Sequence, residues 1–118
     1  MIEAAITMKA IPKKRSELLQ TLRLMKEQIS MEKGCLNCFF YQDANDENMF
    51  IITEEWATQE ELNRYLKSDI FGALIGANSL LIEPADINIK VVSYTAGMEA
   101  VKQAREQSRI LNEKEKKL

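Results

Sequence analysis

The amino-terminal segment alternates between apolar and polar positions. Its apolar side chains lie two residues apart, at Ile2, Ala4, Ile6 and Met8. Successive side chains of a strand point to opposite faces, so this spacing predicts a strand with one buried face. Beyond Pro12 the apolar residues recur every three or four positions instead, at Leu18, Leu22, Met25 and Ile29. This spacing predicts a helix, and Gly34 is a natural stop because glycine adopts the left-handed conformation found just past helix ends.

Two more strands are predicted on either side of a polar turn. Cys35–Asp43 is rich in aromatic residues and contains no breaker, and Asn48–Trp56 is again strongly apolar. The polar run DANDEN between them is typical of a hairpin connection. The sequence therefore predicts an antiparallel hairpin in the middle of the chain.

The third quarter of the chain predicts two short helices and a last strand. Thr58 and Glu61 form a T-x-x-E capping box, and Ser68 can cap a second helix. The apolar positions of these helices are Leu62, Tyr65 and Leu66, then Phe71, Leu74 and Ile75. Asp86–Tyr94 alternates again and is the fourth predicted strand. The order β-α-β-β-α-β predicts an α+β ferredoxin-like fold, an antiparallel sheet with helices on one face.

Both faces of the predicted hairpin are apolar. In Asn48–Trp56 one alternating set holds Phe50, Ile52, Glu54 and Trp56, and the other holds Met49, Ile51 and Thr53. The helices can cover only one face, and a solvated second face is expected to be polar. A second copy of the same sheet is the simplest cover, so we expect a symmetric homodimer.

The pattern changes again after Tyr94. A narrow apolar stripe at helical spacing runs through a strongly charged segment, at Met98, Val101, Ala104, Ser108 and Leu111. We expect a ferredoxin-like domain over residues 1–95 and a helical extension over residues 96–118. The stripe fits equally a helix lying on its own subunit and an arm that embraces the partner.

The composition excludes several kinds of chemistry. The 118 residues contain no histidine, which removes the commonest general base at neutral pH and the usual ligand of zinc and haem iron. Four glycines leave no phosphate-binding loop. The net charge of −2 gives no sign of a nucleic-acid partner. No run is apolar enough to span a bilayer and no secretory signal begins the sequence, so a cytoplasmic location without membrane attachment is expected.

Two cysteines stand three residues apart, Cys35 and Cys38. A C-x-x-C spacing signals redox chemistry where it opens a helix. Here it lies in a predicted strand, where side chains three apart point to opposite faces. We therefore expect two free structural thiols.

The segment EEWATQEELNRYLKSDIFGALIGA, Glu54–Ala77, resembles the antibiotic biosynthesis monooxygenase family. In that family a strand ending in E-x-W or E-E-W passes into a capped helix and a second short helix. Gly34-Cys35 before an aromatic strand and Glu83-Pro84 before the last strand are similar to the same family. The resemblance covers about residues 1–95. It implies a dimeric α+β barrel of two sheets, with a cavity between sheet and helices in each subunit.

The resemblance also implies an activity. Members oxidise quinols and polyketide anthrones with molecular oxygen and without metal or flavin, and another branch, closer to the YLKSDIF run, degrades haem. Haem degraders hold iron through a histidine at the position that matches Ile75, and quinol-type members often carry one near the position of Tyr65. Since this sequence has a histidine at neither position, haem degradation by the known route is not expected. We also expect no metal and no cofactor.

A cofactor-free oxygenase needs a dry aromatic pocket, a base and hydrogen-bond donors. The candidate catalytic residues are Trp56, Tyr65 and Glu54. The candidate substrate-binding residues are Asn37, Phe39, Tyr41 and Phe71. For the aromatic residues the alternative is a role in core packing, with their polar tips satisfied. For Glu54 the alternative is a position at a strand end with the carboxylate reaching water or a lysine.

Two functions stay open on the sequence. The first is a monooxygenase acting on a small aromatic quinol-like substrate. The second is a non-catalytic dimeric barrel that binds a small hydrophobic ligand or a partner protein. The motif Trp56–Phe71 favours the first, and the missing histidines favour the second.

Overall fold

A computed structural model describes residues 1–117 and has the predicted β-α-β-β-α-β order. The strands are β1 (Ile2–Lys9), β2 (Cys35–Gln42), β3 (Met49–Trp56) and β4 (Asp86–Val91). The helices are α1 (Arg15–Ser30), α2 (Gln59–Leu66), α3 (Asp69–Gly76) and α4 (Met98–Lys117). Short 3-10 turns, Pro12–Lys14 and Ala77–Leu80, precede α1 and follow α3. The antiparallel sheet has the order β2-β3-β1-β4, which confirms the ferredoxin-like fold and the extra carboxy-terminal helix.

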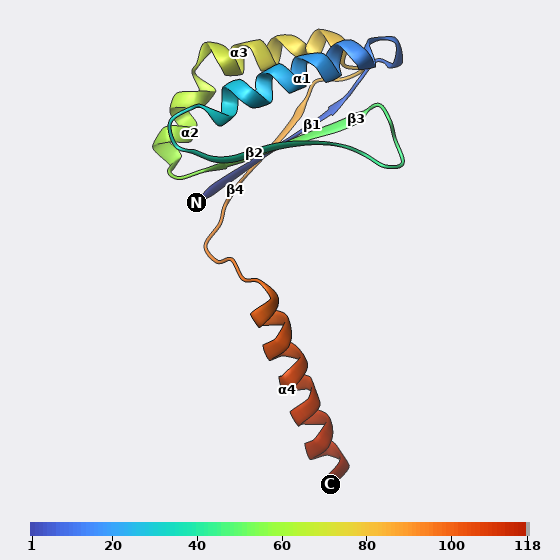
Figure 1. Cartoon of the computed structure of the whole chain (residues 1–118), viewed down its shortest axis with the longest axis vertical. Helices are drawn as coiled ribbons and strands as arrows, with labels where there is room; N and C mark the ends of the chain where they lie inside the picture. The colour runs from blue at the N-terminus through green and yellow to red at the C-terminus, as the bar shows by residue number, and fades with distance from the viewer. Residues whose placement is uncertain (118) are drawn as a thin grey trace.

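One face of the sheet carries the helices α1, α2 and α3, as Figure 1 shows. The even positions of β1 and β3 point toward these helices and are buried, whereas the odd positions face the other way. Helix α1 buries the stripe that the sequence predicts, Leu18, Leu22, Met25 and Ile29. The sheet of this chain is open, not a closed barrel. We call the face of the sheet that carries α1–α3 the helix-side face, and the opposite face the outer face.

The predicted capping residues hold α2 and α3 in place. The Thr58 hydroxyl accepts the backbone N–H of Glu61 at 3.2 Å, and the Ser68 hydroxyl accepts that of Phe71 at 3.3 Å. Each bond satisfies one of the free N–H groups in the first turn of its helix. Gly34 has the expected positive φ, 88°, between α1 and β2. These local signals fix where the aromatic residues of α2 and α3 meet the sheet.

The last strand is shorter than the sequence predicts. β4 ends at Val91 and not at Tyr94, although the N–H of Val92 still donates to the carbonyl of Met1 at 2.9 Å. The chain then leaves the sheet, and α4 projects away from it on the side opposite α1–α3 (Figure 1). Over the described residues 1–117, none of the helices is both long and apolar enough to cross a membrane.

Candidate functional site

A single buried carboxylate lies at the centre of the helix-side face. Glu54 points inward from β3 and its side chain is fully buried. One carboxylate oxygen accepts the indole N–H of Trp56 at 3.2 Å, and the other accepts the hydroxyl of Tyr65 at 2.9 Å. A buried carboxylate is tolerated only when such donors replace its water. The three residues that the sequence selects as catalytic candidates are thus in direct contact, in an interior closed to solvent.

Aromatic stacking extends this contact from the sheet to α3. The rings of Trp56 and Tyr65 stack with centroids 4.6 Å apart, and the rings of Tyr65 and Phe71 meet edge to face with centroids 5.4 Å apart. Both geometries are favourable for aromatic pairs. The Ser68 hydroxyl donates to the carbonyl of Tyr65 at 2.6 Å and thereby ties the two short helices together at this point. We call Glu54, Trp56, Tyr65 and Phe71 the aromatic–carboxylate cluster.

The electrostatics of the cluster follow from its burial. Removal from water raises the pKa of Glu54, and the hydrogen bonds from Tyr65 and Trp56 oppose that rise without cancelling it. The pKa of Tyr65 is also raised, first by burial and then by the nearby Glu54 charge. A carboxylate with a raised pKa in a water-free interior is a stronger base than an exposed one. Tyr65 in turn is held as the neutral phenol that donates to it.

The raised pKa of Glu54 gives a pH dependence that can be measured. The carboxyl group of Glu54 binds its proton more tightly in the folded protein than in the unfolded chain. The stability that this tighter binding contributes is fully present below pH 4.5, the ordinary pKa of a glutamate. That stability is lost as the pH rises through the raised folded pKa. We expect the difference in unfolding free energy between wild type and Glu54→Gln to fall as the pH rises above 4.5. Urea unfolding between pH 4 and pH 8, followed by circular dichroism, measures it.

The control for this experiment is Glu55→Gln, the same substitution one position along β3 on the outer face. It removes one carboxylate without touching the aromatic–carboxylate cluster. A wild-type advantage over Glu54→Gln that grows with pH would contradict the direction of the pKa shift.

A small hollow lies beside the cluster, between α3 and β4. Its volume is about 50 Å³, and its lining residues are Ile6, Phe71, Leu74, Ile75, Asn78, Ala85 and Ile87. This volume suits one or two water molecules. The cavity between sheet and helices that the family resemblance implies is therefore small in this chain. Phe71 belongs to both the hollow and the cluster, so its ring alone connects them.

Three candidate substrate-binding residues lie elsewhere. Asn37, Phe39 and Tyr41 are exposed on the outer face of β2, and the structure does not bring them together with the cluster. The Asn37 amide donates to Glu55 at 2.8 Å. Phe39 and Tyr41 lie with ring centroids 6.4 Å apart and are about half exposed (47% and 54%). Of the four candidate substrate-binding residues, only Phe71 lies near Glu54 within one chain.

The cysteine pair corrects a sequence-based expectation. The register of β2 against β3 shifts between Cys35 and Asn37, so that Cys35 lies opposite Trp56 and Cys38 opposite Glu54. This irregularity turns both thiols to the helix-side face, not to opposite faces. They are free, as expected. Burial, followed by the Glu54 charge, raises the pKa of Cys35 to about 11 and that of Cys38 to about 12. Such thiols are poor nucleophiles at neutral pH.

Part of the hollow could not be predicted from the sequence. Asn78 and Ala85 line it, and the Asn78 side chain accepts the N–H of Ala85 at 3.1 Å. Neither residue belongs to an apolar stripe or a motif, so no signal in the sequence selects it. Among residues 1–117 no three of the Cys, Asp and Glu side chains gather as a metal site would require.

Comparison with known proteins places these features in a family. The family model described as antibiotic biosynthesis monooxygenase matches residues 1–77, which include all four residues of the cluster. An uncharacterized protein of Synechocystis is 27% identical over 95 residues, a match that covers 80% of this chain. The chain spans 65% of the length of this curated relative.

Solved structures show the same fold. A provisionally assigned antibiotic biosynthesis monooxygenase of Deinococcus radiodurans superimposes with a TM-score of 0.76 at 20% identity, covering 82% of this chain and 97% of that one. Rv0793 of Mycobacterium tuberculosis superimposes with a TM-score of 0.74 at 18% identity, covering 81% and 98%. At such identities the likeness concerns the fold and not the reaction.

Proposed function

We propose that this chain, which belongs to the antibiotic biosynthesis monooxygenase family, oxidises a small aromatic quinol-like substrate with molecular oxygen. The observation that carries the proposal is the Tyr65–Glu54–Trp56 arrangement, closed to water and joined through Phe71 to an apolar hollow. A cofactor-free oxygenase requires a base and hydrogen-bond donors in a dry aromatic site. The cluster supplies each of them.

The substrate ring is proposed to lie against Phe71, between α3 and β4. The hollow holds too little volume for a ring, so Phe71 and Ile75 must move aside on binding. A shift of the Phe71 ring uncovers the ring of Tyr65, against which it packs. A substrate hydroxyl can then reach the Tyr65 oxygen, and the phenol already donates to Glu54.

In the proposed reaction the proton moves along this pair. The substrate hydroxyl passes its proton to the Tyr65 oxygen as Tyr65 passes its own to Glu54. The substrate anion then gives an electron to oxygen, and the two radicals combine. Overall the substrate gains one oxygen atom and loses two hydrogens, and these leave with the second oxygen atom as water. The step needs no reductant besides the substrate.

A homodimer is part of the proposal. The outer face of β2 and β3 presents Phe39, Tyr41, Met49 and Ile51, of which the first two are exposed. An apolar outer face of a sheet favours cover by a second sheet. A second copy packed here would leave the aromatic–carboxylate cluster on the far side of each sheet.

The second candidate is a binding module without catalysis. Each oxygen of Glu54 already accepts a donor, and the sequence has no histidine to replace it as base. On this alternative the cluster is a satisfied core network, and the hollow accepts an apolar ligand without reaction.

Oxygen uptake tests the proposal. The purified, chelator-treated protein is assayed with reduced naphthoquinols and anthrones, and Tyr65→Phe is expected to lower the rate by about 10²-fold because it breaks the proton path. Trp56→Phe should also lower the rate, since it removes one donor to Glu54. The matched control is Tyr94→Phe, the same change at an exposed tyrosine beyond the end of β4, which should leave uptake unchanged.

The outcomes separate the two candidates. Loss of uptake in Tyr94→Phe, with Tyr65→Phe unaffected, would contradict the proposed site. No uptake in any variant, with quenching of the single tryptophan Trp56 by the same compounds, would favour the binding module.

A further inference from the structure

We propose that α4 packs against a second copy of the chain, on the helix-side face of β4, and so completes the candidate site of that copy. The inference needs a dimer and does not depend on oxygenase activity. It begins from two surfaces that a single copy leaves without a partner.

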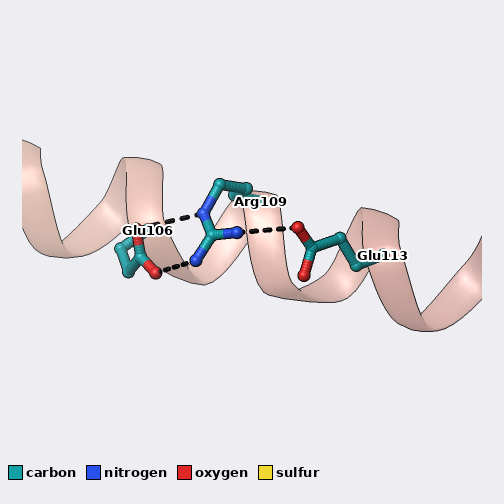
Figure 2. Close-up of polar contacts among 3 residues, drawn as sticks. All are labelled: Glu106, Arg109 and Glu113. Atoms are coloured by element: carbon teal, nitrogen blue, oxygen red, sulfur yellow. Dashed lines mark hydrogen bonds and ion pairs between the residues drawn. The ribbon is translucent and has the colours of Figure 1, made fainter.

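The first surface is α4 itself. Its described side chains are exposed apart from a half-buried Ala100, and the helix stands clear of the domain (Figure 1). The interactions between side chains within α4 are mainly the ion pairs of Arg109 with Glu106 and with Glu113, the latter at 2.7 Å (Figure 2). In proteins most of the stability of a helix comes from packing one of its faces against other elements. A helix of 20 residues therefore needs a surface to pack on.

One side of α4 is suited to such packing. Residues three and four apart share a side of a helix, and on α4 this side, the α4 seam, carries Ala100, Val101, Ala104, Ser108 and Leu111. The ion-paired residues Glu106, Arg109 and Glu113 lie on the opposite side. The seam is mostly small, so two copies of it facing each other would bury little apolar area and lack the large residues of a coiled coil. A seam of this kind fits a surface of larger side chains.

The second surface is the helix-side face of β4. Ile87, Ile89 and Val91 pair with Ile6, Ala4 and Ile2 of β1, and so they point to the same side as these core residues. The β1 residues are buried, yet the exposed fractions on β4 are 42%, 44% and 74%. Helices α1–α3 cover the side chains of this edge strand only in part. A row of β-branched apolar side chains on an open sheet edge indicates a missing cover.

The two surfaces match in length and charge. The α4 seam spans residues 100–111, about 18 Å of helix, and a six-residue strand is about 20 Å long. Arg105 borders the seam and makes no ion pair within residues 1–117. Exposed Glu83 and Asp86 stand at the beginning of β4. Residues 1–98 carry 10 basic and 14 acidic side chains, whereas residues 99–118 carry 6 and 4, so the extension and the domain have opposite net charges.

The course of the chain points to the second copy. After β4 the hydrogen bond from Val92 to Met1 keeps the backbone on the line of the strand. The chain then passes to the side of the sheet away from α1–α3 (Figure 1). Helix α4 is thus on the wrong side to cover its own β4. It projects on the side where a second copy would pack against the outer face.

This placement makes the candidate site a shared one. Ile87 is both a β4 contact for α4 and a wall of the hollow. The α4 of the second copy would close the hollow along β4 and complete its apolar lining. Each site would then need both chains.

Disulfide trapping tests the placement without an activity assay. In a Cys35→Ser, Cys38→Ala background, chains with Ala104→Cys and a large tag are co-expressed with untagged chains carrying Ile89→Cys. We expect a mixed disulfide dimer of intermediate size under mild oxidation. Glu106→Cys, on the opposite side of α4, should not give it. A chain that carries both cysteines is oxidised alongside. Three results would each overturn the proposal: no mixed dimer, cross-linking only between Ala104→Cys chains, or, in the chain with both cysteines, cross-linking only within the chain.

A measurement on the chain with its native cysteines guards against a misfolded background. Leu111→Asp places a charge in the α4 seam, and Ile110→Asp places the same charge one residue away, outside it. We expect Leu111→Asp to increase amide hydrogen exchange in β4 at least severalfold, with Ile110→Asp close to wild type. Equal exchange in the two variants would contradict docking through the seam.

Discussion

Replacing Trp56 by alanine is expected to lower the free energy of unfolding by about 3–5 kcal/mol, the usual cost of removing a large buried aromatic side chain. Trp56 is fully buried at the end of β3 and stacks on Tyr65 at 4.6 Å. Its loss also leaves one oxygen of Glu54 without a donor, because only the Tyr65 hydroxyl would remain. A buried acceptor left unpaired adds about 1–3 kcal/mol. Urea unfolding followed by far-ultraviolet circular dichroism measures the change, since the only tryptophan is absent.

The control is Trp56→Phe, which keeps much of the packing and removes the indole N–H. Comparison of the two variants separates the cost of the cavity from that of the hydrogen bond. A loss below 1 kcal/mol in Trp56→Ala would mean that this end of the sheet collapses around the cavity at little cost. It would also contradict a close-packed aromatic–carboxylate cluster.

The elements of the fold could be predicted from the sequence because their signals are local. The alternation in β1, the stripe of α1 and the caps Thr58 and Ser68 each involve residues a few positions apart, and all are confirmed. The contact of Glu54 with Trp56 was within reach too, since the two residues share one face of one strand. Its bond to Tyr65 joins different elements and required the packing of α2 on the sheet.

The remaining features depend on registers and packing that no single segment encodes. The shift between Cys35 and Asn37 needs the alignment of β2 with β3, and without it parity places the two thiols on opposite faces. The size of the hollow depends on how far Phe71 and Ile75 reach toward β4, a property of the packed structure. Whether α4 lies on its own subunit was open on the sequence because a narrow stripe fits either arrangement. In the structure α4 stands apart from its own domain.

The second large effect on stability is expected at Gly34, where α1 gives way to β2. Its φ of 88° lies in the left-handed region, which costs a residue with a Cβ about 1–2 kcal/mol. An added Cβ would also lie 1.7 Å from a carboxylate oxygen of Glu61 and 2.6 Å from the Cβ of that residue. Overpacking of this kind adds about 1–3 kcal/mol. We therefore expect Gly34→Ala to lower the free energy of unfolding by about 2–5 kcal/mol, the sum of the two effects.

A double-mutant cycle isolates the part of the loss that is due to the Glu61 carboxyl group. Glu61→Ala removes this group but keeps the Cβ 2.6 Å from the new methyl group, so the double variant should recover part of the loss and retain the backbone cost and the contact with that Cβ. Gly72→Ala is the matched control, because a Cβ there meets no heavy atom within 4 Å and the residue lies inside α3. That change should stabilise the protein by about 0.5–1 kcal/mol. If Gly34→Ala and Gly72→Ala shifted stability in the same direction, neither the left-handed backbone nor the Glu61 contact could be controlling the junction between α1 and β2.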